Sequence, residues 1–161
     1  MIRVGIGYDI HGLTEGAFLV LGGVRIPFEK RFSAHSDGDV LCHAIADALL
    51  GAAGLPNIGV LFPDTDMHYK DADSLHLLSE VVRRVRDKGY AVLQLDANII
   101  AQRPKLTPHI GCMRETLATT LNIDPDMISI KPRTNEGFGP EGRGEAISAQ
   151  AVVVITKLPA R

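Results

Sequence analysis

A change of hydrophobic period between residues 33 and 54 constrains the fold more than any other feature of this sequence. The stretch SAHSDGDVLCHAIADALLGAAG carries apolar residues at helical spacing, whereas the sequence before it has the pattern of short strands. Ser36 and Asp39 resemble a capping box at the start of this helix, and Gly54 is placed to end it. We therefore expect this helix to pack against the strands, through two apolar rows: Val40, Ala44 and Ala48, and Leu41, Ile45 and Leu49.

The remainder of the chain predicts strands that alternate with two further helices. The run IRVGIGYDIH has the small residues of a strand that packs closely against another backbone. In the strand at 90–101, alternation places one set of side chains on a common face: Leu93, Leu95, Ala97 and Ile99. The other expected elements are a hairpin at 18–28 around Gly22-Gly23, helices at 73–89 and 108–121, strands at 127–134 and 145–157, and loops at 59–72, 102–109 and 135–144.

This order of elements predicts an α+β fold. We expect one domain over residues 1–161, built as a two-layer sandwich. A mixed four-stranded sheet would carry the helices on one face, with the short hairpin beside it. The length is typical of one domain, and 45% of the residues are apolar, which is enough for a substantial core.

Composition excludes several classes of function. The formal net charge is -2 and no Lys/Arg run stands out, so binding of nucleic acid is not expected. No apolar run approaches the roughly 20 residues of a membrane span, and the start lacks a signal-peptide pattern. Cys42 and Cys112 are far apart, which fits a reducing compartment. We expect a cytoplasmic protein, in a bacterium rather than in a plastid stroma.

Three side chains suggest a metal site. Asp9 and His11 are two residues apart in a strand, so both point to one side of it. His43 lies on a polar stripe of the expected helix between Asp39 and Asp47, at spacings of four residues. One carboxylate and two imidazoles form a usual ligand set for catalytic zinc, with a fourth position open. Spacing alone also allows a turn aspartate, a surface histidine and a hydrogen-bonded helix histidine.

Loops supply further candidates, each with a structural alternative. His35 and Ser36 precede the helix and could bind an anion at its N-terminus, or serve capping only. Asp64 and Asp66 could accept a substrate hydroxyl, or form a solvated acidic turn. The segment 101–106 could read a nucleobase through its backbone, or simply connect a strand to a helix.

The loop KPRTNEGFGPEGRGE has the composition of a phosphate-binding segment. It combines four glycines with Lys131, Arg133, Arg143 and the hydroxyl of Thr134, groups that bind phosphate oxygens. Glu136 suits a Mg²⁺ ion shared with phosphates, because Mg²⁺ takes only one or two protein carboxylates. The alternative is a flexible connection between two strands.

Taken together, these segments resemble the 2-C-methyl-D-erythritol 2,4-cyclodiphosphate synthase family. The motifs that carry the resemblance span nearly the whole chain: GYDIH, LGGVRIPFEK, AHSDGDVLCHAIADALLGAAG, LFPDTD, IIAQRPKL and GRGE. The resemblance implies a homotrimer with active sites between subunits. It also implies a phosphorus–oxygen lyase of the non-mevalonate pathway, which cyclises 4-diphosphocytidyl-2-C-methyl-D-erythritol 2-phosphate and releases CMP.

The resemblance implies a role for each matching residue. Zn²⁺ would be held by Asp9, His11 and His43, and Mg²⁺ or Mn²⁺ with the substrate phosphates by Glu136. His35 and Thr134 are implied to act on the phosphates during catalysis. The implied substrate contacts are Ser36, Asn57, Asp64, Asp66, Ala101, Gln102, Arg103, Pro104, Lys105, Leu106 and Arg143. Asn57 stands where members often have Asp.

Two further expectations concern the surroundings of this site. Asp47, one turn beyond His43, is placed to orient a ligand imidazole. Arg143 would line a three-fold channel that binds an isoprenoid diphosphate in some members of the family. Two other functions stay open: a zinc-dependent phosphohydrolase that uses water as nucleophile, and a non-catalytic trimer that binds isoprenoid diphosphates.

Overall fold

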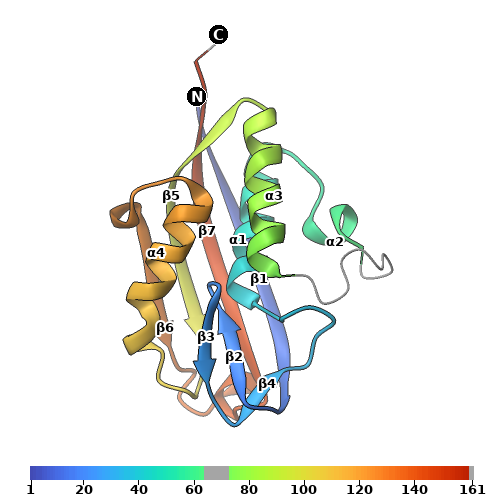
Figure 1. The fold of residues 1–161 in the computed structure, drawn as a ribbon, viewed down its shortest axis with the longest axis vertical. Helices are drawn as coiled ribbons and strands as arrows, with labels where there is room; N and C mark the ends of the chain where they lie inside the picture. Colours follow the sequence, from blue (N-terminus) through green and yellow to red (C-terminus); the bar gives the residue numbers. More distant parts are fainter. Residues whose placement is uncertain (64–72, 160–161) are drawn as a thin grey trace.

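The computed structural model describes residues 1–63 and 73–159, which form a mixed sheet, a hairpin and a layer of helices (Figure 1). The strands are β1 (Ile2–Glu15), β2 (Phe18–Leu21), β3 (Val24–Pro27), β4 (Lys30–Phe32), β5 (Tyr90–Ile100), β6 (Ile128–Arg133) and β7 (Ala146–Lys157). The α-helices are α1 (Val40–Ala53), α2 (Ile58–Leu61), α3 (Ser74–Asp87), α4 (Ile110–Leu121) and α5 (Gly139–Gly142). Short 3₁₀ turns cover Thr107–His109 and Pro125–Met127.

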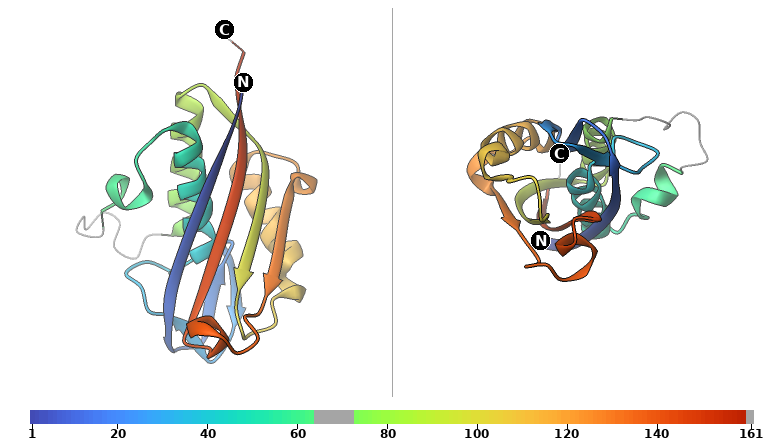
Figure 2. Two further views of the ribbon diagram at one scale, coloured as in Figure 1. Left: turned by 180° about the vertical axis from the view of Figure 1, so that it is seen from behind. Right: turned by 90° about the horizontal axis from the view of Figure 1, so that it is seen from below.

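The strand order of the main sheet is β4-β1-β7-β5-β6, and β2 pairs only with β3. β5 and β6 run parallel, whereas the other neighbours in the sheet are antiparallel. Figure 2 shows the sheet from behind, with the long helices all on its other face. This arrangement confirms the expected α+β fold with a mixed sheet, helices on one face and a separate hairpin.

The expected number of strands in the main sheet was wrong, because the sheet has five strands and not four. The additional strand is β4, which pairs with Leu13–Glu15 at the end of β1. A strand of three residues is too short to show an alternating pattern, so the sequence gives no period from which to predict it.

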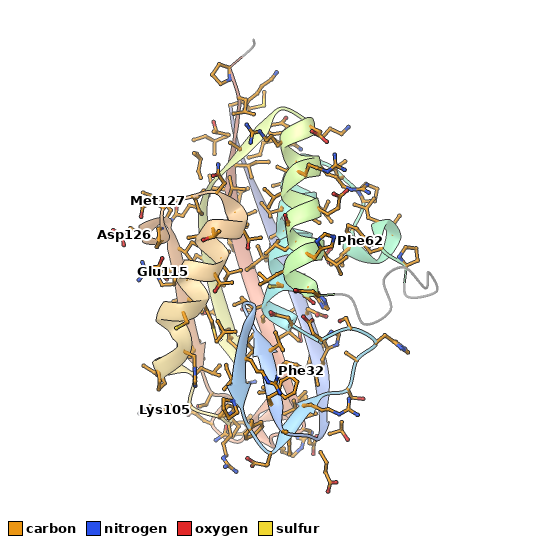
Figure 3. The ribbon with its side chains drawn as sticks, viewed as in Figure 1. Phe32, Phe62, Lys105, Glu115, Asp126 and Met127 are labelled. Carbon is orange, nitrogen blue, oxygen red and sulfur yellow. The ribbon has the colours of Figure 1, made fainter. Side chains whose placement is uncertain are left out.

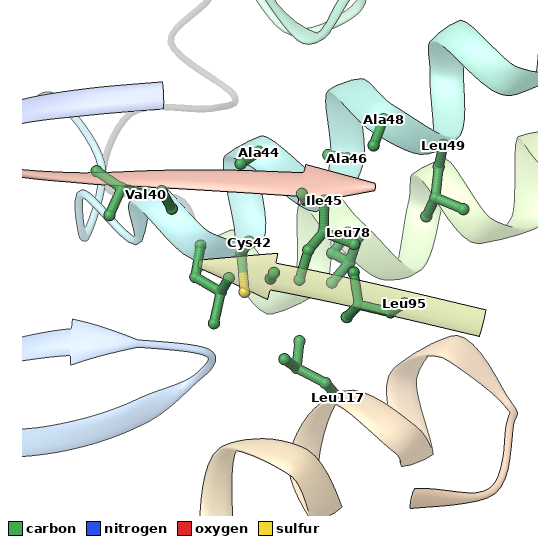
Figure 4. Packing of buried hydrophobic residues seen from close by; sticks show 14 of the residues in the cluster. Val40, Cys42, Ala44, Ile45, Ala46, Ala48, Leu49, Leu78, Leu95 and Leu117 are labelled. Atoms are coloured by element: carbon green, nitrogen blue, oxygen red, sulfur yellow. The ribbon is translucent and has the colours of Figure 1, made fainter. Parts of the chain in front are cut away.

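Helix α1 forms the centre of the core and is buried along almost its whole length (Figure 4). It packs against β1 where Gly5 and Gly7 leave room for its backbone. A Cβ atom on Gly7 would lie 1.8 Å from the carbonyl oxygen of Ala44, and one on Gly5 would lie 1.9 Å from that of Ala48. The expectation that this strand packs closely on another backbone is therefore confirmed.

The start of α1 differs from the expected capping box. Asp39 is the N-cap residue, and its carboxylate accepts a hydrogen bond from Cys42 N at 3.0 Å. Ser36 lies further upstream, where its hydroxyl oxygen accepts a hydrogen bond from Gly38 N at 3.1 Å. Both Asp and Ser are good N-caps, so residue type alone did not decide between them. Gly54 ends the helix in the left-handed conformation, as expected.

Two local predictions also need correction. Leu93 does not share the buried face of β5, because a β-bulge lies between Val92 and Gln94 and leaves Leu93 39% exposed. The one-turn helix α2 overlaps the start of the loop expected at 59–72, and α5 lies within the loop expected at 135–144. Helices of four residues are shorter than the window in which helical periodicity can be recognised.

None of the helices in the described ranges has the length and apolar character that a membrane crossing requires.

Candidate metal centre and active-site cavity

Asp9, His11 and His43 converge, as their positions in β1 and α1 predict. The two β1 residues point to the helix-covered side of the sheet, where the first turn of α1 presents His43. The distance from Asp9 Oδ2 to His43 Nδ1 is 2.9 Å, and from the same oxygen to His11 Nε2 it is 3.2 Å. The two ring nitrogens are 3.3 Å apart. One potential ligand atom of each residue therefore faces a common point.

These separations fit a four-coordinate ion. In a tetrahedral site with metal–ligand bonds of about 2.0–2.1 Å, neighbouring ligand atoms lie roughly 3.3 Å apart. The three measured distances are close to that edge length. The two imidazole rings are also nearly perpendicular, with an interplanar angle of 88°. One oxygen and two nitrogens form a donor set suited to a divalent ion such as zinc, so the residues present fit such a group.

The immediate surroundings of His43 are electrostatically negative. Burial lowers the pKa of His43, but the hydrogen bond and the charge of Asp9 raise it, and the carboxylates of Asp39 and Asp37 add to that effect. The net direction is upward from the ordinary histidine pKa. A site that attracts a proton in this way also attracts a cation.

A polar pair behind His43 was not anticipated from the sequence. Ser74 Oγ lies 2.9 Å from His43 Nε2, the ring nitrogen that faces away from the cluster. The hydroxyl of Ser74 is in turn hydrogen-bonded to the carboxylate of Asp37. Ser74 opens α3, 31 residues after His43, and no local pattern connects the two. Only the packing of α3 against α1 brings them together.

The cluster opens into a cavity of about 580 Å³ between β1, α1, α2 and α3. His35 and Ser36, on the segment that leads into α1, lie on its wall, as does Asp47. The other residues that line it are Tyr8, Asp9, His11, Ser33, Ala34, His43, Ile58, Gly59, Phe62 and Leu77. The cavity thus combines the Asp9-His11-His43 cluster with hydroxyl, imidazole and apolar groups, a mixture typical of a binding site for a small molecule.

Two of the predicted residues near α2 have structural roles, and two others lie outside the described residues. The carboxylate of Asp47 accepts a hydrogen bond from Ile58 N at 2.7 Å. Asn57 is the N-cap of α2 and accepts from Val60 N at 3.0 Å. These contacts position α2 at the rim of the cavity. Asp64 and Asp66 lie outside the described residues.

A second group of predicted residues gathers at the carboxyl ends of the parallel strands β5 and β6. Ala101 N donates to the carbonyl of Arg133 at 2.9 Å, which holds the segment 101–106 beside the start of the loop that contains Thr134 and Glu136. Figure 3 shows Lys105 in this region, well apart from Phe62 of the cavity. None of the described residues that line the cavity comes from 101–106 or from 134–143.

The loop after β6 is exposed and ordered by local contacts. Glu136 N donates to Thr134 Oγ1 at 3.4 Å, and Glu136 has a φ of 51°, a left-handed backbone conformation that is uncommon for a residue other than glycine. Arg143 forms an ion pair with Glu145, with Nε 2.9 Å from Oε1. That pairing raises the pKa of Arg143 and lowers the pKa of Glu145.

Together, the fold and the site define a class of protein: a small α+β protein in which strand β1 and the central helix α1 bring an aspartate and two histidines together with the geometry of metal ligands. The chain belongs to the YgbB family, whose model matches residues 2–156.

Individual relatives agree with this assignment. The chain is 55% identical to 2-C-methyl-D-erythritol 2,4-cyclodiphosphate synthase of Moorella thermoacetica, over 96% of this chain and 94% of the relative. It is 53% identical to the synthase of Clostridium perfringens, over 97% of this chain and 100% of the relative. Among solved structures it resembles the CDP complex of IspF from Plasmodium falciparum, with a TM-score of 0.86 and 36% identity, over 98% of this chain and 97% of the other.

Proposed function

We propose that this chain converts 4-diphosphocytidyl-2-C-methyl-D-erythritol 2-phosphate to 2-C-methyl-D-erythritol 2,4-cyclodiphosphate and CMP, in the non-mevalonate route to isoprenoid precursors. The observation that carries the proposal is the cluster of Asp9, His11 and His43 with tetrahedral spacing at the wall of a 580 Å³ cavity. The substrate class comes from the relatives in the YgbB family, which are named as synthases of this cyclodiphosphate.

The reaction is an internal phosphoryl transfer. An oxygen of the 2-phosphate attacks the β-phosphorus of the same molecule, and the bond from that phosphorus to the oxygen bridging to the α-phosphorus breaks. CMP leaves with the bridging oxygen. One phosphorus–oxygen bond forms and one breaks, so no water, oxidant or covalent enzyme intermediate takes part. The protein therefore has to align two oxygens and stabilise charge.

Two cations would share the stabilisation of charge. Zn²⁺ would be held by Asp9, His11 and His43, with one coordination position left for a substrate oxygen. Mg²⁺ or Mn²⁺ would be held by Glu136 together with substrate phosphates. When bound, these ions supply positive charge that lets an anionic oxygen approach an anionic phosphorus.

The side chains on the cavity wall would orient the substrate. His35 and Ser36 sit beside the start of α1 and can donate hydrogen bonds to phosphate oxygens there. The apolar side chains of Phe62 and Leu77 exclude water from one wall, which strengthens the polar contacts on the other. Asp64 and Asp66 would receive the hydroxyls of the methylerythritol.

The other predicted half of the site would come from a neighbouring subunit. The metal cluster lies on β1, next to β4 at one edge of the sheet, whereas 101–106 and Thr134 lie at the ends of β5 and β6 toward the opposite edge. In a homotrimer, the β6 edge of one chain can meet the β1 side of the next. Segment 101–106 would then hold cytosine, Thr134 the nucleotide phosphates, and Arg143 would face a three-fold channel able to take an isoprenoid diphosphate.

We place this activity in the cytoplasm, in line with the two free cysteines, Cys42 and Cys112.

The proposal is tested by following the purified protein and its substrate by ³¹P NMR with Zn²⁺ and Mg²⁺ present. The expected products are the cyclic diphosphate and CMP in equal amounts. If linear phosphates form instead, the chain is a phosphohydrolase and the proposal is wrong. If the substrate binds but no product forms, the chain is a non-catalytic binding protein.

A matched pair of variants locates the reaction at the metal cluster. His43→Ala removes a ligand, so turnover is expected to fall by at least 100-fold with the oligomer unchanged. His76→Ala changes an exposed histidine of α3 and is expected to keep wild-type turnover. Equal activity of the two variants would refute a role for the cluster.

A further inference from the structure

The contact between Ser74 and His43 fixes where the hydrogen atoms of both groups lie. Ser74 is 1% exposed, and its oxygen lies 2.9 Å from His43 Nε2. The same hydroxyl is hydrogen-bonded to Oδ1 of Asp37. A carboxylate only accepts hydrogen bonds, so the single hydroxyl hydrogen of Ser74 points to Asp37. The serine oxygen can then face His43 only as an acceptor.

This orientation selects one tautomer of the imidazole. If Ser74 accepts, then Nε2 of His43 must carry a hydrogen. In the neutral ring, the lone pair is consequently on Nδ1, the atom that lies 2.9 Å from Asp9 Oδ2 and 3.3 Å from His11 Nε2. That is the nitrogen a metal ion in the cluster would need.

Asp37 is itself held in place by backbone donors. Its Oδ2 accepts from Ser74 N at 3.0 Å, and its Oδ1 accepts from Asp39 N at 3.1 Å. Asp37 thus bridges the residue that opens α3 and the residue that caps α1. Any movement of the start of α3 relative to α1 would break the contact with the histidine.

We propose that Asp37 and Ser74 are positioning residues, which hold His43 in the Nε2–H tautomer and aim its Nδ1 at the metal centre. The inference rests on the metal site of the proposed function, but it concerns affinity and tautomer rather than product. Neither Asp37 nor Ser74 lines the cavity. They act through the histidine, as the outer partners of metal-binding histidines commonly do.

The experiment compares Ser74→Ala with Ser79→Ala, which changes an exposed serine of the same helix. Zinc affinity is measured by competition with a chromogenic chelator. The tautomer of His43 is measured by ¹⁵N NMR of the metal-free protein at an alkaline pH, where the ring is neutral. Ser74→Ala is expected to bind zinc 10–100-fold more weakly and to lose the single Nε2–H tautomer. Ser79→Ala should match the wild type in both measurements.

Two further variants separate positioning from folding. Ser74→Thr keeps the hydroxyl and is expected to restore most of the affinity, whereas Asp37→Asn should weaken it because its amide no longer guarantees an acceptor for the serine. Circular dichroism checks that each variant is folded. Wild-type zinc affinity and an unchanged tautomer in Ser74→Ala would overturn the proposal, even if the chain makes the cyclic product. Conversely, if Ser74→Ala loses zinc affinity and the single tautomer, the positioning role holds even when the wild-type product is a linear phosphate.

Discussion

At the scale of single residues, Asp39 links two parts of the fold that are separate in the sequence. Its side chain is fully buried and accepts hydrogen bonds from three backbone donors: Gly22 N at 3.0 Å, Gly23 N at 2.8 Å and Cys42 N at 3.0 Å. Burial raises the pKa of its carboxyl, although these three donors lower it. One carboxylate thus fixes the turn between β2 and β3 onto the start of α1.

We expect Asp39→Asn to lower the free energy of unfolding by about 1–3 kcal/mol, because the amide NH₂ would face a buried backbone N–H and leave it unsatisfied. Urea denaturation measures the difference. The control is Asp73→Asn at the exposed N-cap of α3, where Asn and Asp cap about equally well and a change within about 0.5 kcal/mol is expected. A neutral Asp39→Asn would show that the hairpin does not depend on this contact.

The three residues of the metal cluster were predictable from the sequence, whereas the two residues that contact His43 from behind were not. Asp9 and His11 share a side of β1 because the strand period is two, which the sequence shows directly. His43 was found through the helical stripe that it shares with Asp47. Ser74 and Asp37 carry no such signal, because their contact depends on how α3 packs onto α1. Periodicity describes one element at a time, so it cannot reveal contacts between elements.

At the scale of elements, the closeness of β1 and α1 depends on two glycines. Gly7 faces Ala44 and Gly5 faces Ala48, so both sides of the contact have small or absent side chains. This approach lets the first turn of α1 come near enough to β1 for His43 to reach Asp9. The prediction of a strand with small residues was thus correct. The close packing that these residues allow sets the distances within the metal cluster.

We expect Gly7→Ala to destabilise the fold by about 1–3 kcal/mol, at the upper end of that range because the added Cβ meets a backbone carbonyl and not a flexible side chain. Metal affinity should fall as well, since α1 must shift away from β1. Gly51→Ala is the matched control: it lies in α1 with nothing within 4 Å of the added atom, and a gain of about 0.5–1 kcal/mol is expected. Thermal unfolding and zinc titration of both variants provide the check.

Short elements mark the limit of prediction at this scale. The long helices and strands were placed correctly because each shows several repeats of its period. β4, α2 and α5 have three or four residues and show none. The bulge at Leu93 is a second kind of limit, because one extra residue reverses the side of the strand on which the following positions lie.

At the scale of the whole molecule, the face of the sheet opposite the helices is strongly apolar along β1. The outward positions carry Ile2, Val4, Ile6 and Tyr8, and Ile6 is 77% exposed. Val152 of β7 extends this apolar face. Figure 2 shows none of the long helices α1, α3 and α4 on this side, where the one-turn helix α5 lies only at the end of the sheet that holds Ser148. Continuous apolar surface of this kind is typical of an interface, and a second copy of the chain is the occupant that the proposed trimer requires.

We expect Ile6→Lys to dissociate the trimer, because three buried ammonium groups would have to lose their hydration near the symmetry axis. The mass in solution, measured by light scattering, should fall from three chains to one while circular dichroism stays unchanged. Ser79→Lys, at an exposed position of α3 on the helix-covered face, should leave the mass as it is. An intact trimer in Ile6→Lys would place the interface elsewhere.

The same assembly predicts that turnover can be restored by mixing two inactive chains. The His43→Ala chain has a defective metal cluster but an intact loop after β6, and the Glu136→Ala chain has the reverse. If each site combines the cluster of one chain with the loop of the next, a mixed trimer contains sites in which both parts are intact. Random reassembly at equal amounts should give about a quarter of wild-type turnover, because one site in four then combines two intact halves from different chains. Native mass spectrometry, with an affinity tag on only one of the two variants, confirms that mixed trimers have formed. If each chain completed its own site, the mixture would remain inactive, and the division of the site between the two edges of the sheet would be refuted.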